Sequence, residues 1–327
     1  MKKICLWIIC LIILLAPWLS VEAKPMKSIY DKTNQHLPPG AFWVENHWKN
    51  TNGFIEVEPV QWRASDTLGL SGSAIPTLGN MIWLKKKYGG KHSVYILDLR
   101  QETHLYIDGL PISLFYKRDE INWGKTPEEI SKEEDYLINY FLKTGFIHIN
   151  KLGKPQSGFK VPMNPHTVTI KDIYSEQVAA QKAGLGYFRI EVPDYHPPAP
   201  DQVDQFLAII KQLPQNAWLH IHCAAGKGRT TTFMIMRDIV TNAKDVSLED
   251  ILAGQEKLGG INLFGVSPSH SSQPWKKEYH QARRHYIKLF YTYVHSGAYP
   301  HETFSAWIKK QPENPYKLIL KTDAYIQ

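Results

Sequence analysis

The chain has 327 residues, 43% of them hydrophobic, and a formal net charge of +7 at neutral pH. This length suffices for one large domain or two small ones with a substantial core. The positive charge favours polyanionic partners. Because the sequence has no zinc-ligand spacing, RNA-binding signature or basic tail, we expect no nucleic-acid partner.

Residues 1–23 are typical of a secretory signal peptide. Lys2 and Lys3 precede an uncharged apolar run, and the segment ends at Ala23, where we expect cleavage. An uncleaved membrane anchor is the alternative, but the run is just short of the ~20 residues that a spanning helix needs, and Pro17 interrupts it. We therefore expect an exported protein, periplasmic or secreted, with a mature domain over residues 24–327 and no stable membrane insertion.

Cysteine usage points to a reactive thiol. Of the three cysteines, Cys5 and Cys10 would leave with the signal peptide, so the mature protein would keep Cys223 alone. Exported proteins usually pair their cysteines in disulfides, so a single one is either an accident or a thiol kept for its reactivity.

The mature chain begins without strong periodicity. Residues 24–60 are rich in Pro, Asn and Trp and predict an extended wrapping segment. A helix is predicted near 77–88, a buried strand at 92–99 and a second helix at 127–141, for which Thr126 is the expected cap.

From residue 145 onward the pattern changes twice. Residues 145–172 hold short alternating runs with Gly and Pro, which predict a small inserted β subdomain. A helix at 175–183, a strand at 187–192 and a helix at 202–212 then restore helix–strand alternation. Further helices are predicted near 246–258, 275–294 and 301–309. The alternation predicts an α/β fold with a mostly parallel central sheet flanked by helices.

The most informative segment is HCAAGKGRT at residues 222–230. It lies between an apolar strand pattern at 217–221 and a helix that begins near Arg229. Backbone N–H groups of such a turn converge on one point, and the helix N-terminus adds positive partial charge there. The segment therefore predicts a phosphate-binding loop with the sulfur of Cys223 at its base.

Each residue type in this loop has a chemical reason. Cys223 would attack as the thiolate, and Arg229 would hold two phosphoryl oxygens with two N–H donors. The two glycines let the backbone approach an oxyanion, and the Thr230 hydroxyl would donate to the sulfur. The residues expected to contact the phosphate are Ala224, Ala225, Gly226, Lys227, Gly228 and Thr230.

The alternative interpretation is a buried structural cysteine followed by an ordinary basic turn. The ordered succession of strand, glycines, hydroxyl and helix favours the catalytic interpretation. Because Arg229 and the loop amides would neutralise the phosphate, we expect no metal ion or other cofactor.

A cysteine that attacks phosphorus needs an acid that protonates the departing alkoxide. Asp194 lies in VPDYHPP at residues 192–198, a proline-stiffened loop that leaves a strand. It is the expected general acid, with Glu191 and Asp201 as the nearest alternatives. By itself it would be an ordinary turn aspartate, and only its combination with Cys223 favours the catalytic role.

The predicted helix at 275–294 carries a basic stripe beside its apolar one. Lys276, His280 and Arg283 are spaced at i, i+4 and i+7, so their charged ends point together. We expect them to add positive charge around the loop, which a multiply phosphorylated ring needs and a single phosphotyrosine does not. A solvated helix face is the alternative.

Three segments together resemble a known family. HCAAGKGRTTTFMIMRDIV, the upstream run from YFRI to LHIHC, and DLRQETH at residues 98–104 are similar to the bacterial protein-tyrosine-phosphatase-like phytases, the cysteine myo-inositol polyphosphate phosphatases. The similarity runs from about residue 69 to about residue 310. It implies a cysteine-phosphatase α/β core with a small partial β-barrel.

The resemblance also implies roles for single residues. Cys223 would be the nucleophile, Arg229 the phosphate clamp and Asp194 the general acid. Asp98, Lys276 and Arg283 match positions that shape the basic substrate pocket of the family. Tyr195 stands where the family commonly has a histidine, and this difference would weaken one substrate contact. A lysine at the position of Lys227 implies a preference for highly charged inositol head groups.

The expected function is hydrolysis of myo-inositol polyphosphates such as phytate through a cysteinyl-phosphate intermediate. Alternatives are a protein-tyrosine or dual-specificity phosphatase, and a phosphoinositide phosphatase that meets membranes through its basic surface. A catalytically idle polyphosphate-binding module is a third, but such a protein has no use for both a thiolate and an acid. No oligomeric state is predicted.

Overall fold

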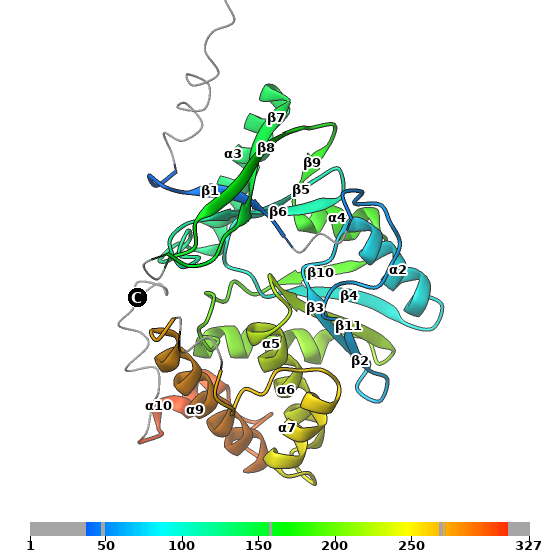
Figure 1. Cartoon of the computed structure of the whole chain (residues 1–327). Coiled ribbons are helices and arrows are strands. Elements are labelled where there is room, and N and C mark those ends of the chain that lie inside the picture. Colours follow the sequence, from blue (N-terminus) through cyan, green and yellow to red (C-terminus); the bar gives the residue numbers. More distant parts are fainter. Residues whose placement is uncertain (1–36, 47–49, 157–158, 268–270, 272, 313–327) are drawn as a thin grey trace, which may run out of the picture. The chain divides into compact units, whose positions relative to one another are not determined.

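The computed structural model describes residues 37–46, 50–156, 159–267, 271 and 273–312. The predicted signal peptide, with Cys5 and Cys10, lies outside these residues, as does the first part of the predicted wrapping segment. Two β-sheets and the helices around them make up the described part of the chain (Figure 1).

The five-stranded sheet has the strand order β10-β4-β11-β3-β2. Its strands are β2 (Arg63–Ser65), β3 (Leu70–Ala74), β4 (Ser93–Asp98), β10 (Gly186–Arg189) and β11 (Ala217–Cys223). All pairings are parallel except β2 with β3, so the predicted mostly parallel sheet is confirmed. His222 of β11 is in register with Asp98 of β4, which brings the carboxyl ends of the two strands together.

Helices cover both faces of this sheet (Figure 1). Those of the larger core are α5 (Pro200–Gln212), α6 (Gly228–Asn242), α7 (Leu248–Lys257), α9 (Lys276–His295) and α10 (Phe304–Lys309). Those of the smaller core are α2 (Leu78–Tyr88) and α4 (Glu176–Lys182). Side chains alternate along the strands, so Leu219 and Ile221 enter the larger core and Trp218 the smaller. Among the described helices, none is long and apolar enough to cross a membrane.

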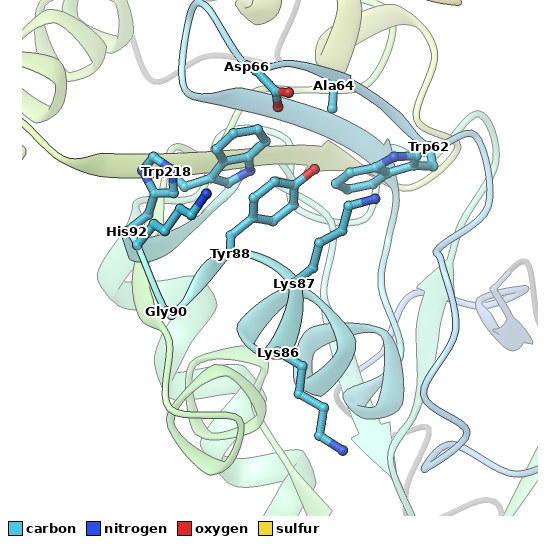
Figure 2. Close-up of a pocket in the computed structure, with 10 residues that line it drawn as sticks. Trp62, Ala64, Asp66, Lys86, Lys87, Tyr88, Gly90, His92 and Trp218 are labelled. Carbon is cyan, nitrogen blue, oxygen red and sulfur yellow. The ribbon is translucent and has the colours of Figure 1, made fainter.

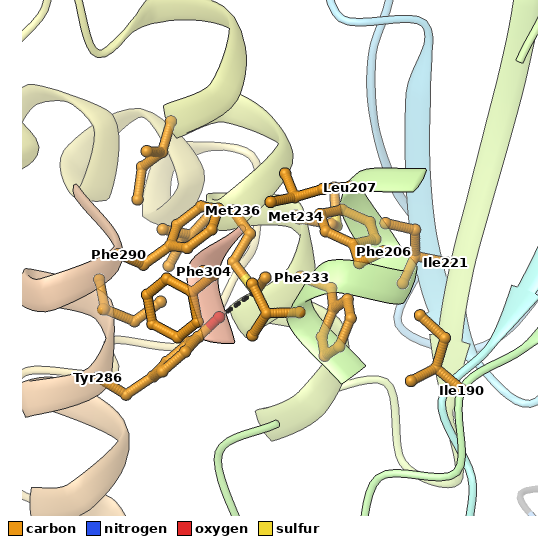
Figure 3. Packing of buried hydrophobic residues seen from close by; sticks show 14 of the residues in the cluster. Ile190, Phe206, Leu207, Ile221, Phe233, Met234, Met236, Tyr286, Phe290 and Phe304 are labelled. Atoms are coloured by element: carbon orange, nitrogen blue, oxygen red, sulfur yellow. Dashed lines mark hydrogen bonds between the residues drawn. The ribbon is translucent and has the colours of Figure 1, made fainter. Parts of the chain in front are cut away.

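The larger core fixes the helix that follows the catalytic loop. Aromatic side chains from four helices pack together there, as Figure 3 shows for Phe206, Phe233, Tyr286, Phe290 and Phe304. The Tyr286 hydroxyl donates to Met236 Sδ of α6 at 2.9 Å. Each such buried aromatic side chain contributes about 1.5–3 kcal/mol. The N-terminus of α6, where the phosphate would bind, therefore rests on a tightly packed core.

The second sheet has six strands in the order β8-β7-β1-β6-β5-β9 and does not close into a barrel. Its strands are β1 (Phe42–Glu45), β5 (His104–Ile107), β6 (Leu110–Phe115), β7 (Phe146–Leu152), β8 (Pro162–Thr169) and β9 (Ile173–Tyr174). The helix α3 (Pro127–Thr144) packs against β5, β7 and β9.

This sheet is larger than the small insertion expected from the sequence. Residues 145–172 supply only the β7–β8 hairpin, and the other four strands come from elsewhere in the chain. A local signal for β5 and β6 was present, because Asp108 and Gly109 join them with φ of +48° and +83°. Asp-Gly in that conformation is the preferred two-residue turn of a β-hairpin.

Candidate active site

The catalytic loop joins the end of β11 at Cys223 to the start of α6 at Gly228. Gly226 within it has φ of +70°, and a Cβ at that position would lie 2.3 Å from the backbone nitrogen of Ala74. Only glycine fits such a close approach at positive φ. The loop therefore lies directly against β3, while Lys227 at its far end is exposed.

A buried arginine holds this loop from behind. Arg63 of β2 donates from Nη1 to the Gly226 carbonyl at 2.8 Å and from Nη2 to Thr231 Oγ1 at 3.0 Å. Burial lowers the pKa of Arg63 to about 10, against an opposing effect of Cys223. Arg63 is 3% exposed, so it supports the loop and does not reach the surface of the site.

The candidate nucleophile, Cys223, lies at the floor of the loop. Cys223 is 3% exposed, and the Thr230 hydroxyl donates to its sulfur at 3.2 Å. Cys223 also lies just before the N-terminus of α6, whose positive partial charge favours a thiolate. A hydroxyl donor and a helix terminus thus both favour a negatively charged sulfur at this point.

Arg229 lies next to the sulfur and is held in one orientation. Its Nη1 and Nη2 donate to the two carboxylate oxygens of Glu102, each at 2.7 Å. Nη2 also lies 3.2 Å from Asp194 Oδ1. Its Nε is buried and has no hydrogen-bond partner among the described residues. Burial lowers the pKa of Arg229, but Glu102 and Asp194 outweigh it, so the guanidinium is charged at all relevant pH values.

Glu102 is a residue of the candidate site that was not expected from the sequence. It is fully buried and accepts hydrogen bonds from both Arg229 and the Nε of Arg100, the latter at 2.9 Å. Burial by itself would raise the pKa of Glu102, but the two arginines hold it below its ordinary value. The sequence did contain a signal for Glu102. It lies just after β4, as the loop of Cys223 lies just after β11, and the carboxyl ends of neighbouring parallel strands meet at one edge of a sheet.

The candidate general acid, Asp194, lies beside Arg229. The Asp194 side chain is 26% exposed and contacts Arg229, as stated above. The two alternatives lie differently: Glu191 Oε1 is 3.8 Å from Arg189 Nε, and Asp201 is exposed in the first turn of α5. Of these three carboxylates, Asp194 is the one that contacts Arg229.

The acid loop is held in place from α9. Arg283 is 3% exposed and its Nη2 donates to the carbonyl of Tyr195 at 2.7 Å, where Tyr195 has φ of +67°. A Cβ at Gly228 would lie 2.8 Å from Arg283 Nη1, so the same guanidinium lies against the catalytic loop. Arg283 therefore contacts both loops, and it also lines a cavity beside Lys227, near where the resemblance places it.

Lys276 and Lys227 lie closer to the surface of the site. Lys276 Nζ lies 4.5 Å from the ring centre of Tyr195 and 5.4 Å from that of Trp275. Burial lowers the pKa of Lys276, with Asp194 acting in the opposite direction. Lys227, His280 and Arg283 line a cavity of about 420 Å³ together with residues of the 261–267 segment.

Asp98 lies beneath the site and has no exposed atom. Its Oδ1 accepts from the Arg100 backbone N–H at 3.0 Å, and its Oδ2 accepts from the Tyr187 hydroxyl at 3.0 Å. Oδ2 also lies 3.1 Å from His104 Nε2. Burial raises the pKa of Asp98, but His104 and Arg189 more than offset this and lower it. The resemblance placed Asp98 at the substrate pocket, whereas the structure engages it entirely with protein groups.

Asp98, His104 and Glu176 offer three ligand atoms within 4.8 Å of one another. His104 Nδ1 faces the Glu102 carbonyl at 2.8 Å, and Nε2 lies 3.0 Å from Glu176 and 3.1 Å from Asp98. A carbonyl and two carboxylates only accept, so both ring nitrogens carry hydrogen and neither has a lone pair for a metal. Burial and Arg100 lower the pKa of His104, but Asp98 and the hydrogen bonds raise it to about 9.

This cluster reaches the residue next to the nucleophile. Glu176 Oε1 lies 2.6 Å from Nε2 of His222, which is fully buried and precedes Cys223. The ionic groups beneath the loop therefore fix the end of β11 from below.

A second cavity, of about 730 Å³, lies elsewhere (Figure 2). It is lined by the aromatic residues Trp62, Tyr88 and Trp218 and by Lys86, Lys87 and Lys91. Lys87 Nζ lies 4.6 Å from the ring centre of Trp83 and 5.6 Å from that of Trp62, so its ammonium group covers the indoles. The catalytic loop and the acid loop contribute nothing to this lining.

Comparisons with known proteins agree with this geometry. A sequence model of the protein-tyrosine-phosphatase-like (PTP-like) phytase family matches residues 97–241. The description of that family reads "inositol hexakisphosphate". That range includes Glu102, Asp194, Cys223 and Arg229. Over residues 97–241 the chain is similar to the PTP-like phytase family.

Two solved structures of this family resemble the fold. A PTP-like myo-inositol phosphatase from Mitsuokella multacida, in complex with myo-inositol-(1,3,4,5)-tetrakisphosphate, is 27% identical with a TM-score of 0.74, covering 84% of this chain and 50% of that one. A PTP-like phytase from Bdellovibrio bacteriovorus is 28% identical with a TM-score of 0.67, covering 84% of this chain and 96% of that one.

A curated relative is longer than this chain. Effector protein hopD2 of Pseudomonas syringae pv. tomato is 29% identical over 208 residues, which are 62% of this chain and 43% of the relative. The chain thus spans about half the length of the Mitsuokella protein and less than half of the effector.

Proposed function

We propose that the chain is a cysteine-dependent phosphomonoesterase that removes phosphate from myo-inositol polyphosphates. The observation that carries this proposal is the grouping of Cys223, Arg229 and Asp194 around one point. Arg229 contacts Asp194 at 3.2 Å, and the charge of Cys223 helps raise the pKa of Arg229, so the sulfur lies near the guanidinium. A nucleophile, a clamp and an acid in one pocket are the three groups that phosphoryl transfer to a thiolate requires.

The first step forms a cysteinyl phosphate. The Cys223 thiolate attacks phosphorus, a P–S bond forms, and the bond from phosphorus to the inositol oxygen breaks. Arg229 and the loop amides stabilise the equatorial oxygens. Asp194 gives its proton to the departing oxygen.

The second step releases phosphate. Water attacks the cysteinyl phosphate while the Asp194 carboxylate takes a proton from it, and the P–S bond breaks. The electron pair returns to the sulfur, where the Thr230 hydroxyl stabilises the thiolate. Arginine and amides supply the charge neutralisation throughout, so the proposal requires no metal ion.

The substrate class follows from the charge around the loop. Lys227 is exposed at the end of the loop, and Lys276 lies half-buried beside Tyr195. Several cations spread around one phosphate site suit a ring that carries several phosphates. The Mitsuokella structure with bound inositol tetrakisphosphate supports the same choice.

Phosphate release from inositol hexakisphosphate in EDTA, compared with a phosphotyrosine peptide, tests the proposal. We expect turnover of the inositol phosphate that EDTA does not change, a much slower rate on the peptide, and no turnover by the Cys223→Ser variant. Faster turnover of the peptide would assign the chain to the tyrosine phosphatases instead. Loss of activity in EDTA would contradict the metal-free scheme.

We also propose that the protein is exported. The support is the composition of residues 1–23 and the single cysteine that would remain after cleavage. N-terminal sequencing of the protein from the periplasm or the medium should begin at Lys24. An intact N-terminus on all of the cellular protein would contradict the proposal.

A further inference from the structure

One stretch of the chain has an unusual charge. Between Asp135 and Asp172 the sequence contains no aspartate or glutamate. The lysines of this stretch are Lys143, Lys151, Lys154, Lys160 and Lys171. The stretch comprises the end of α3 and the β7–β8 hairpin. The hairpin therefore has no acidic residue of its own, and Lys151 pairs with Glu45 of β1 at 3.5 Å.

The end of this hairpin also exposes large apolar side chains. Leu152 and Phe159 are 40% exposed and Met163 is 47% exposed. Lys151 is directly opposite Met163, and Leu152 is opposite Pro162, so the two pairs point to opposite faces of the hairpin. Both faces thus expose apolar area. We call Lys151, Leu152, Lys154, Phe159, Lys160 and Met163 the hairpin tip.

The hairpin tip adjoins the rim of the active site. The guanidinium carbon of Arg118 lies 5.2 Å from the ring centre of Phe159 and 4.6 Å from that of Trp275. The Trp275 ring lies 4.8 Å from that of Tyr195, the residue after the general acid. In Figure 1 the hairpin runs from the end of α3 toward α9. A surface that binds the tip therefore also faces the mouth of the active site.

We propose that the hairpin tip docks on an anionic lipid surface. Leu152, Phe159 and Met163 would enter the headgroup region, and Lys154 and Lys160 would lie at the level of the lipid phosphates. Apolar insertion combined with attraction to anionic lipids is how peripheral proteins bind bilayers. The docking does not depend on which phosphate ester is cleaved. Its consequence, access to inositol phosphates carried on lipids, rests on the function proposed above.

Other partners fit the tip less well. A soluble polyphosphate or a nucleic acid would use the lysines but would leave the apolar side chains in water. A protein partner that adds a strand to the sheet would pair with β8, the edge strand. Pro162 and Pro165 of β8 lack backbone N–H groups, which hinders such pairing. The lipid surface is the occupant that uses both the charge and the apolar area.

Flotation of the full-length Cys223→Ser protein with vesicles tests the proposal. We expect binding to phosphatidylcholine vesicles that contain phosphatidylserine and little binding to phosphatidylcholine alone. The Leu152→Ser/Met163→Ser variant should bind at least about tenfold more weakly, because two apolar side chains no longer leave water. Lys154→Ser should bind about fivefold more weakly, the effect of one surface lysine.

The matched control is Leu142→Ser. Leu142 is 54% exposed but lies on α3, at the other end of the hairpin, so this variant should bind vesicles like its parent. In the Cys223-containing protein, Leu152→Ser/Met163→Ser should hydrolyse soluble inositol hexakisphosphate at the wild-type rate, which shows that it folds.

Two results would overturn the docking proposal: equal binding to both kinds of vesicle, or undiminished binding by the Leu152→Ser/Met163→Ser variant. Sensitivity to Lys154→Ser without sensitivity to the apolar change would assign the tip to a soluble polyanion. Failure of the wild type to hydrolyse inositol hexakisphosphate, with vesicle binding intact, would refute the proposed function and leave docking standing.

Discussion

Glu102→Gln is the perturbation that tests the arrangement of the site most sharply. Glu102 accepts two 2.7 Å hydrogen bonds from Arg229 and one of 2.9 Å from Arg100, and all three side chains are buried. Glutamine keeps the volume and one acceptor oxygen, but its NH₂ group would face a guanidinium. The substitution therefore leaves two buried cations without their carboxylate.

The magnitude follows from that burial. Breaking a buried ion pair by removing one partner costs about 3–5 kcal/mol. Each kcal/mol lowers the Tm of a chain of this size by about 2–4 °C, so we expect a fall of roughly 6–20 °C. Because Arg229 also loses its orientation, kcat/KM for inositol hexakisphosphate should fall about 10²–10³-fold, as when a transition-state donor is removed.

Calorimetry and initial rates measure both effects. Asp172→Asn is the matched control, because Asp172 and Lys182 form an exposed ion pair at 3.1 Å. Exposed pairs contribute about 0–1 kcal/mol, so this variant should retain the wild-type Tm within about 4 °C and full activity. A Glu102→Gln protein that melts and turns over like the wild type would refute the claim that Glu102 fixes Arg229.

Three further predictions concern the acid, the buried cluster and the loop. Asp194→Asn should lower kcat/KM for inositol hexakisphosphate about 10²–10⁴-fold but barely affect kcat/KM for p-nitrophenyl phosphate, because kcat/KM reports the first step and that leaving group needs no acid; equal losses of kcat/KM on both substrates would exclude the acid role. The pKa of His104 is raised from the ordinary 6.5 of a histidine to about 9 in the folded protein, so its stabilisation is full below pH 6.5 and is lost as pH rises through 9. Urea unfolding should show a loss on the order of 3 kcal/mol between these limits, absent in His104→Gln, and a flat wild-type profile would count against the charged histidine. Gly226→Ala should cost about 1–3 kcal/mol and most activity, since its Cβ would meet β3, and a fully active variant would contradict the geometry of the loop.

The local parts of the site were predictable from the sequence. The order of strand, glycine-containing turn and helix around Cys223 is a contiguous pattern, and β11 and α6 lie within two residues of their predicted positions. The long helices and the parallel sheet followed from periodicity for the same reason. Thr230 could be assigned a hydroxyl contact to the sulfur because both residues belong to one loop.

The non-local parts were not predictable in the same way. β1, β5 and β9 are short strands that owe their stability to partners distant in the chain, as in the pairing of Tyr106 with Tyr174. Helical spacing predicted that the charged ends of Lys276 and Arg283 point together, but it does not show how deeply each side chain is buried. Arg283 is directed to the backbone of the acid loop, and Asp98 is covered by Tyr187 and His104 from other strands.

The central claim is that the Cys223 thiolate carries the phosphoryl group during turnover. Acid quenching during hydrolysis of inositol hexakisphosphate, followed by mass spectrometry of the peptide that contains Cys223, tests it directly. The account predicts that this peptide gains the mass of one phosphoryl group, and that the Cys223→Ser protein shows neither the adduct nor turnover. Turnover by the Cys223→Ser protein, or a phosphoryl group trapped on another residue, would contradict it.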